Sequence, residues 1–240
     1  MAAANLARQD LKVLAFDVFG TVVDWRKGLM TELAAIAQQH QLTINPAEVA
    51  DAWRRRARPL MDRVSRGEMA FQLLDDLHRA ALLELVAEFS LESLSQADLD
   101  RLVLAWHNLP PLPDAVAGLA RLRTHFVVTT LSNGGMAMLV DVARAAGLSF
   151  DCILSTELVK SYKPDPRTYR MVPSLLAVRP EQAMMVAAHP YDLKAAAAQG
   201  MRTAFVRRPQ EWGTGKAEVP DFAVDITADD FIDLASQLGA

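Results

Sequence analysis

The 240-residue sequence is poor in several features, and each shortage excludes a class of protein. Its single cysteine, Cys152, excludes an intramolecular disulfide, so we expect a reducing, cytoplasmic setting. No stretch approaches the roughly 18 uninterrupted apolar residues of a membrane helix, and no membrane partner is expected. A net charge of −4 gives no electrostatic reason to expect nucleic acid. Because 51% of the residues are hydrophobic, the chain is predicted to fold.

Short apolar runs alternate with helical patterns over much of the chain. Four such runs predict buried parallel strands that end in loops, at 12–20, 126–135, 183–190 and 201–208. Helical patterns lie between or after them, at 137–147, 165–178 and 192–200. The alternation predicts an α/β fold with a doubly wound, Rossmann-like parallel sheet.

Residues 25–104 lack this alternation and carry helical periodicity almost throughout. We expect them to form an all-helical cap subdomain, inserted into an α/β core made of residues 1–24 and 105–240. The length suits one core with an insertion better than two independent domains. Prolines 110, 111 and 113 suit the segment that re-enters the core.

Polar side chains gather where the predicted strands end, which is where open α/β sheets bind their ligands. The groups at these ends are Asp17 with Thr21, Thr130 with Ser132 and Asn133, Lys163 after a further apolar run, and His189 with Asp192. Together they supply a nucleophile, hydroxyl and amide donors, a cation and a second carboxylate. The sequence therefore predicts one active site at this edge of the sheet.

Four strings in this order resemble the motif set of the haloacid dehalogenase superfamily: FDVFGTVVDW (16–25), TLSNGG (130–135), SYKPDPRTY (161–169) and VAAHPYD (186–192). More narrowly, they resemble the type II 2-haloacid dehalogenases. The resemblance implies that Asp17 attacks the halogen-bearing carbon of a small anionic substrate, a haloacetate or an (S)-2-haloacid. Halide then leaves, and water hydrolyses the aspartyl ester to release the 2-hydroxy acid.

Two departures separate this chain from the phosphatases of the superfamily. Phosphatases carry an acid two residues after the nucleophile, where this chain has Phe19, and a departing halide needs no such acid. Their acidic Mg²⁺ ligands follow the fourth strand, where this chain has Ala188 and His189. Mg²⁺ prefers oxygen ligands. The resemblance therefore implies a metal-independent reaction without a cofactor.

Roles around the nucleophile follow from the same resemblance. Asp17 must be ionised to attack, so Lys163 and the hydroxyls of Thr21 and Ser132 are expected to lower its pKa. Backbone N–H groups near Ser132 and Asn133, where a helix is expected to begin, are predicted to hold the substrate carboxylate.

The pocket wall is predicted from the cap and from aromatic residues. Arg54, which follows a tryptophan as in the family, should reach down from the cap to receive the halide or the carboxylate. Its neighbours at 55, 56 and 58 are the alternatives if the helical register differs. Phe19, Trp25 and Tyr191 are expected to wall the pocket, and Tyr169 aligns with a site tyrosine of the family.

Several alternatives stay open. Either Asp192 or His189 activates the hydrolytic water, and we favour Asp192 as the group that orients both the water and Lys163. The alternative role of His189 is that of a donor to the halide. The rival functions are a phosphatase acting on a small phosphate ester and a non-catalytic relative that binds a ligand or partner.

The resemblance also implies a homodimer through the cap. The preferred halogen, fluoride included, does not follow from the motifs.

Overall fold

The computed structural model describes residues 10–216 and 218–240, so the first nine residues of the predicted core lie outside the described part. Five parallel strands form one sheet in the order β2-β1-β3-β4-β5. Their bounds are β1 Val13–Phe16, β2 Val127–Thr130, β3 Ala183–Ala187, β4 Arg202–Val206 and β5 Ile226–Ala228. All four predicted strands are present. The edge strand β5 was not predicted, because three residues are too few for an apolar pattern to stand out.

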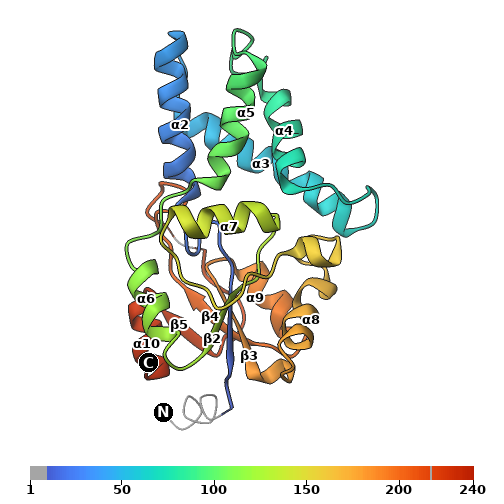
Figure 1. Cartoon of the computed structure of the whole chain (residues 1–240), viewed down its shortest axis with the longest axis vertical. Helices are drawn as coiled ribbons and strands as arrows, with labels where there is room; N and C mark the ends of the chain where they lie inside the picture. Colours follow the sequence, from blue (N-terminus) through green and yellow to red (C-terminus); the bar gives the residue numbers. More distant parts are fainter. Residues whose placement is uncertain (1–9, 217) are drawn as a thin grey trace.

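Helices cover both faces of the sheet, which confirms the doubly wound α/β fold (Figure 1). Leu14 and Phe16 of β1 pack in one apolar cluster, and Val13 and Ala15 pack in a second cluster on the opposite face. The first face is covered by α6 (Ala115–Leu122), α7 (Met136–Ala145) and α10 (Phe231–Leu238). The second is covered by α8 (Pro166–Leu175) and α9 (Pro190–Ala197). A strand buried on both faces explains the unbroken apolar run VLAF.

Four helices, here called the cap helices, stand together beyond the carboxyl edge of the sheet (Figure 1). They are α2 (Trp25–His40), α3 (Pro46–Ser65), α4 (Leu74–Leu85) and α5 (Gln96–Leu104). Local sequence sets their starts: Asp24 accepts a hydrogen bond from the backbone N–H of Lys27, and Ser95 forms a capping box with Asp98. Among the described residues, no helix is long and apolar enough to cross a membrane.

The two connections between the sheet and the cap helices run side by side. Val23 forms an isolated antiparallel bridge with Pro111, and the backbone N–H of Asp24 donates to the carbonyl of Pro110 at 2.9 Å. A short 3₁₀ helix, η1 (Ala105–His107), begins the return. The predicted proline linker thus pairs with the segment that leads from β1 to the cap helices. This pairing holds the base of the cap helices above the sheet edge.

Close packing of α6 on α10 gives a test of the core. A Cβ added to Gly118 would lie 2.3 Å from the Cβ of Phe231 and 3.0 Å from its carbonyl carbon. Alanine favours a helix over glycine by about 1 kcal/mol. We nevertheless expect Gly118→Ala to lower the free energy of unfolding by about 1–3 kcal/mol, because a backbone atom cannot move aside cheaply. Urea denaturation followed by circular dichroism measures this change.

The control is Val116→Ala on the same helix, where the side chain is 46% exposed. Its free energy of unfolding should change by less than about 0.5 kcal/mol. Equal stability of Gly118→Ala and the wild type would contradict the described packing.

Candidate active site

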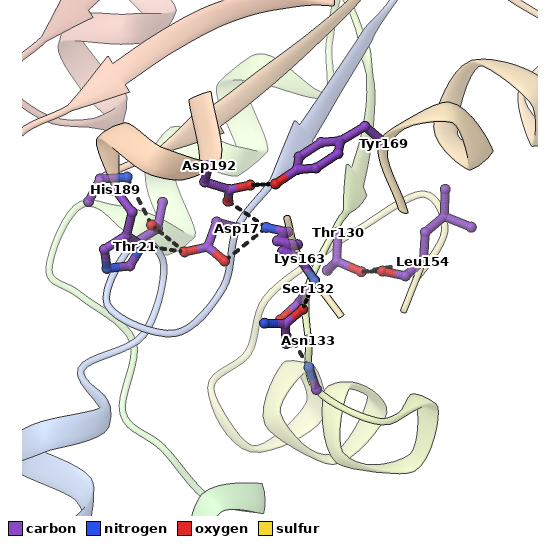
Figure 2. Close-up of polar contacts among 12 residues, drawn as sticks. Asp17, Thr21, Thr130, Ser132, Asn133, Leu154, Lys163, Tyr169, His189 and Asp192 are labelled. Carbon is purple, nitrogen blue, oxygen red and sulfur yellow. Dashed lines mark hydrogen bonds and ion pairs between the residues drawn. The ribbon is translucent and has the colours of Figure 1, made fainter. Parts of the chain in front are cut away.

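Three neighbouring strands deliver side chains to one point at the carboxyl edge of the sheet. Strand β1 lies between β2 and β3, and Phe16 is in register with Thr130 on one side and Val186 on the other. Asp17 directly follows β1, and His189 comes shortly after the end of β3. In-register parallel strands end together, so the predicted convergence of these groups is present (Figure 2).

Lys163 reaches the same point by another route. It does not follow a strand, as the sequence had suggested, but sits in the loop between the 3₁₀ helix η2 (Thr156–Val159) and α8. The preceding apolar run makes only isolated bridges beside β2, at Cys152 and Ser155. The backbone N–H of Lys163 donates to Oδ1 of Asn133 at 2.9 Å, which fixes the loop against the end of β2.

A buried ion triad links two carboxylates through one lysine (Figure 2). The Nζ atom of Lys163 donates to Oδ1 of Asp17 at 3.1 Å and to Oδ2 of Asp192 at 2.6 Å. The hydroxyl of Tyr169 donates to the other oxygen of Asp192 at 2.7 Å. Lys163 and Asp192 are almost inaccessible, with 1% and 0% of their surface exposed. Burial disfavours the lysine charge, but the two carboxylates outweigh it and keep the pKa of Lys163 above its ordinary value.

The second oxygen of Asp17 is bound as well. Oδ2 accepts a hydrogen bond from the Thr21 hydroxyl at 2.9 Å and lies 3.0 Å from Nδ1 of His189. The Thr21 hydroxyl in turn accepts the backbone N–H of Ala188 at 3.0 Å, so its proton points to Asp17. Burial opposes ionisation of Asp17, but the charge of Lys163 and the bonds from His189 and Thr21 hold its pKa below the ordinary value. A bound, ionised carboxylate is poised for nucleophilic attack.

The sequence analysis did not predict Glu211, which binds the ring of His189 on the side opposite Asp17. Nε2 of His189 lies 3.0 Å from both carboxylate oxygens of Glu211, and the indole N–H of Trp25 donates to Oε1 at 3.0 Å. Burial lowers the pKa of His189, but Glu211 and Asp17 together raise it well above the ordinary value, so its ring is an imidazolium. The only available sign was that Glu211 lies in the loop after the fourth predicted strand.

Gly20 makes room for this carboxylate. Its φ is +83°, and a Cβ at this position would lie 2.1 Å from Oε1 of Glu211. Glycine is therefore required twice, by the left-handed backbone and by the close approach of a buried side chain. The Gly20 that marks the end of the first predicted strand thus also admits the partner of His189.

A cavity of about 500 Å³ opens over Asp17 between the sheet edge and the cap helices. Its core wall contains Asp17, Phe19, Asn133, His189 and Tyr191, and its cap wall contains Arg54, Arg55, Arg58, Pro59, Met61, Leu74 and His78. The predicted contributions of Phe19, Asn133, Tyr191 and Arg54 to the wall are therefore present. The volume lies within the usual range for a small-molecule site.

Arg54 carries an unpaired positive charge in the wall of this cavity. Its guanidinium carbon lies 4.9 Å from the ring centroid of Trp25 and 6.0 Å from that of Trp106. It forms no hydrogen bond or ion pair with any residue in the described ranges, whereas Arg56 points away to Glu84 and Glu88. The helical register thus turns Arg54 inward, together with Arg58, whose guanidinium stacks on Tyr191 at 4.4 Å.

Four predicted residues differ in position from what the sequence suggested. Trp25 and Tyr169 are fully buried behind the cavity and do not line it, because each donates its polar hydrogen to a buried carboxylate. The Ser132 hydroxyl accepts the N–H of Gly134 and forms no hydrogen bond with Asp17. The oxygens of Asp17 are bound instead by Lys163, Thr21 and His189. Both oxygens of Asp192 are occupied by Lys163 and Tyr169. Asp192 therefore orients the lysine, as predicted, and each of its oxygens already accepts one hydrogen bond.

Helix starts also differ slightly from expectation. Helix α9 begins at Pro190, with His189 as its N-cap, so Asp192 lies in the first turn instead of capping the helix. Helix α7 begins at Met136 with Gly135 as N-cap, three residues beyond Asn133. The side-chain oxygen of Asn133 accepts the N–H of Lys163, so the backbone N–H groups predicted to hold the substrate carboxylate lie just before this helix and not in its first turn.

The donor set does not fit Mg²⁺, the ion of the superfamily's phosphatases. Magnesium requires several oxygen ligands in octahedral geometry. The oxygens of Asp17 and Asp192 are already bound by an ammonium, an imidazolium and two hydroxyls. The positions of the further acidic ligands hold Ala188 and the imidazolium of His189, and no cluster of three metal-binding side chains occurs within residues 10–216 and 218–240.

The pairing of His189 with Glu211 gives a test of the site electrostatics. In Glu211→Gln the charge that raises the pKa of His189 is lost, so this pKa should fall. A raised pKa stabilises the fold below the unfolded-state value of about 6.5 and loses that contribution as the pH rises through the folded value. The variant should therefore lose this contribution at lower pH than the wild type. Titration of the His189 ring by NMR measures the shift.

An identical His189 titration in both proteins would show that Glu211 does not hold the imidazolium.

Comparison with known proteins agrees with this geometry. Residues 11–200 match the family of haloacid dehalogenase-like hydrolases. (S)-2-haloacid dehalogenase 1 of Pseudomonas sp. (strain CBS-3) is 32% identical over 219 residues, covering 84% of this chain and 88% of that protein. (S)-2-haloacid dehalogenase 4A of Burkholderia cepacia is 30% identical over 204 residues, covering 82% and 84%.

Two solved structures share the whole architecture. An L-2-haloacid dehalogenase superposes with a TM-score of 0.91 at 42% identity, covering 95% of this chain and 99% of that one. A defluorinating L-2-haloacid dehalogenase superposes with a TM-score of 0.92 at 40% identity, covering 96% of each. The resemblance seen in the four motifs is thereby confirmed, and the chain belongs to the haloacid dehalogenase-like hydrolases.

Proposed function

We propose that this protein hydrolyses small 2-haloacids, a haloacetate or an (S)-2-haloacid, to the 2-hydroxy acid and halide through an ester on Asp17. The observation that carries the proposal is the buried, ionised Asp17, bound by Lys163 beneath a small cavity whose cap wall presents the unpaired Arg54. The similarity to (S)-2-haloacid dehalogenases supports the same chemistry.

The first step is a displacement at carbon. One carboxylate oxygen of Asp17 attacks the halogen-bearing carbon from the side opposite the halogen, and the carbon–halogen bond breaks with its electron pair on the halide. The carbon is inverted and joined to Asp17 as an ester. Phe19 stands where a phosphatase holds its acid, and this agrees with a leaving group that departs as an anion and needs no proton.

The second step hydrolyses the ester, and His189 is the group we assign to activate water. Esterification removes the negative charge of Asp17, one of the two charges that keep His189 protonated. Its pKa therefore falls at this point, and the imidazolium releases one proton to solvent. Neutral His189, held at Nε2 by Glu211, then takes a proton from water as the hydroxide attacks the side-chain carbonyl carbon of Asp17.

Collapse of the resulting tetrahedral intermediate breaks the bond to the product oxygen. The product takes the remaining water proton as its hydroxyl hydrogen, and Asp17 is restored as a carboxylate beside protonated His189. One proton and one halide are released overall, as the net reaction requires. Asp192 acts only through Lys163, since both of its oxygens are occupied.

The cap helices are proposed to belong to a cap subdomain of residues 25–104 that closes the site from water. Contacts across the boundary support this: the amide of Asn133 lies 3.6 Å from the sulfur of Met61, and the Ser65 hydroxyl lies 2.8 Å from the carbonyl of Tyr162. A homodimer through the cap and a cytoplasmic location stay predictions.

Halide release tests the proposal directly. The wild type with EDTA should release halide from chloroacetate or (S)-2-chloropropionate, because no step uses a metal ion. Asp17→Asn should lower this rate by at least about a thousandfold, since it removes the nucleophile. Ion chromatography measures the halide. A single turnover in heavy-oxygen water should leave the label in the carboxylate of Asp17, measured by mass spectrometry of the peptide.

The counter-assay is phosphate release from p-nitrophenyl phosphate with Mg²⁺. Efficient phosphatase activity that EDTA abolishes, combined with no halide release from any haloacid, would overturn the proposed function. Val116→Ala, far from the cavity on the exposed side of α6, serves as the handling control and should keep the wild-type rate.

A further inference from the structure

One side chain of the cavity wall has no role in the steps above. His78 lies on α4 in the cap wall, one turn after Leu74, which lines the same cavity. Only 2% of its surface is exposed. Its backbone carbonyl accepts the indole N–H of Trp53 at 2.8 Å, so α4 is fixed to α3 at this residue.

The imidazole of His78 is buried without a hydrogen-bond partner. Nδ1 forms no hydrogen bond with any of the described residues. The ring instead stacks on Trp106 at 3.9 Å between centroids, with an interplanar angle of 23°. Leaving a buried polar group unpaired costs about 1–3 kcal/mol. The other ring nitrogen, Nε2, also has no hydrogen bond within the described residues. Because His78 lines the cavity, this nitrogen is available to a ligand.

The surroundings of His78 specify what kind of ligand fits. Burial depresses the pKa of His78, and the positive charges of Arg54 and His107 depress it further, which favours the neutral ring with one N–H. The indole N–H of Trp106, beneath the ring, is also buried and unpaired. This part of the wall therefore presents a guanidinium and an imidazole N–H, with no carboxylate paired to either of them in the described chain, while Trp106 lies behind the imidazole. Such a set calls for a small anion.

The direction of the displacement decides which anion this is. The attacking oxygen, the carbon and the leaving halogen lie in one line, so the halogen points away from Asp17. Asp17 lines the cavity from the sheet edge, and Arg54 and His78 line it from the cap helices α3 and α4. The halogen therefore leaves toward the cap wall. The substrate carboxylate, attached to the same carbon, points to the side.

The geometry points to His78 as a hydrogen-bond donor to the departing halide, beside Arg54 and supported by the ring of Trp106. The inference rests on the proposed function, because it names the leaving-group site of that reaction. Fluoride is the strongest hydrogen-bond acceptor among the halides and the hardest to release. His78 is accordingly expected to matter most for a fluorinated substrate and least for a brominated or iodinated one.

The test compares leaving groups in variants that keep the wall filled. His78→Phe retains a flat ring on Trp106 but removes both nitrogens, and His78→Asn restores an N–H donor. The ratio of kcat/KM for fluoroacetate to that for bromoacetate should fall by about tenfold or more in His78→Phe, the loss expected for one hydrogen bond to a charged acceptor. His78→Asn should recover part of this ratio.

Leu74→Met is the matched control, since it changes the same wall one turn away without touching a donor. Its ratio should stay within about threefold of the wild type. If the wild type releases no fluoride, the ratio of chloroacetate to iodoacetate carries the same comparison. A His78→Phe variant that slows every substrate equally would overturn the inference and indicate a structural role. A uniform rise in KM would assign His78 to the carboxylate instead.

Halide binding separates this inference from the proposed function. Iodide should quench the tryptophan fluorescence of the wild type saturably, because Trp25, Trp53 and Trp106 surround the site. The midpoint should rise about tenfold in His78→Phe. No halide release from any haloacid would defeat the proposed function, whatever the quenching shows. Normal halide release with an unchanged midpoint and an unchanged leaving-group ratio would defeat only the role of His78.

Discussion

The contact on which the rest of the site depends is the buried ion pair between Asp17 and Lys163, 3.1 Å apart at the end of the central strand. Removing two charges from water costs several kcal/mol each, and the attraction between them offsets this only when their other hydrogen bonds are also satisfied. The surrounding residues meet that condition: Thr21 and His189 bind Asp17, while Asp192, itself held by Tyr169, binds Lys163. The result is that the carboxylate of Asp17 stays ionised although it is buried.

The charges of the site are arranged so that the reaction itself changes their balance. Three buried carboxylates, Asp17, Asp192 and Glu211, face the cations Lys163 and His189, and Arg54 lies close enough to lower the pKa of Glu211. Burial would raise that pKa, but the neighbouring cations outweigh it. An ester on Asp17 removes one negative charge beside His189 and leaves Glu211 in place. In the proposed reaction, the contacts of His189 with Asp17 and Glu211 thus favour an imidazolium before alkylation and a neutral imidazole, able to activate water, after it.

The cap wall contributes the complementary half of the site. An aromatic cluster of Trp25, Trp53, Trp106 and His78 fills the space between the cap helices and the sheet edge. The rings of Trp25 and Trp106 lie beside the guanidinium of Arg54, and a partly buried charge interacts more strongly with an anion than one in bulk solvent. Trp25 links both halves, because its ring lies under Arg54 and its N–H binds Glu211. The walls of the cavity are therefore coupled through one buried residue.

The local pattern of residues was enough to predict the parallel strands, the helical cap, and the convergence of Asp17, Asn133 and His189 at one edge, because strand burial and strand ends are written in short apolar runs. It was also enough to name the family from four motifs. It could not predict Glu211 or His78, which come from a loop and a cap helix with no motif around them. Nor could it assign Ser132, Trp25 and Tyr169 to supporting contacts. Those outcomes depend on which donor forms a hydrogen bond with which buried carboxylate. These residues are distant in the chain, so their pairing is decided only when the fold brings them together.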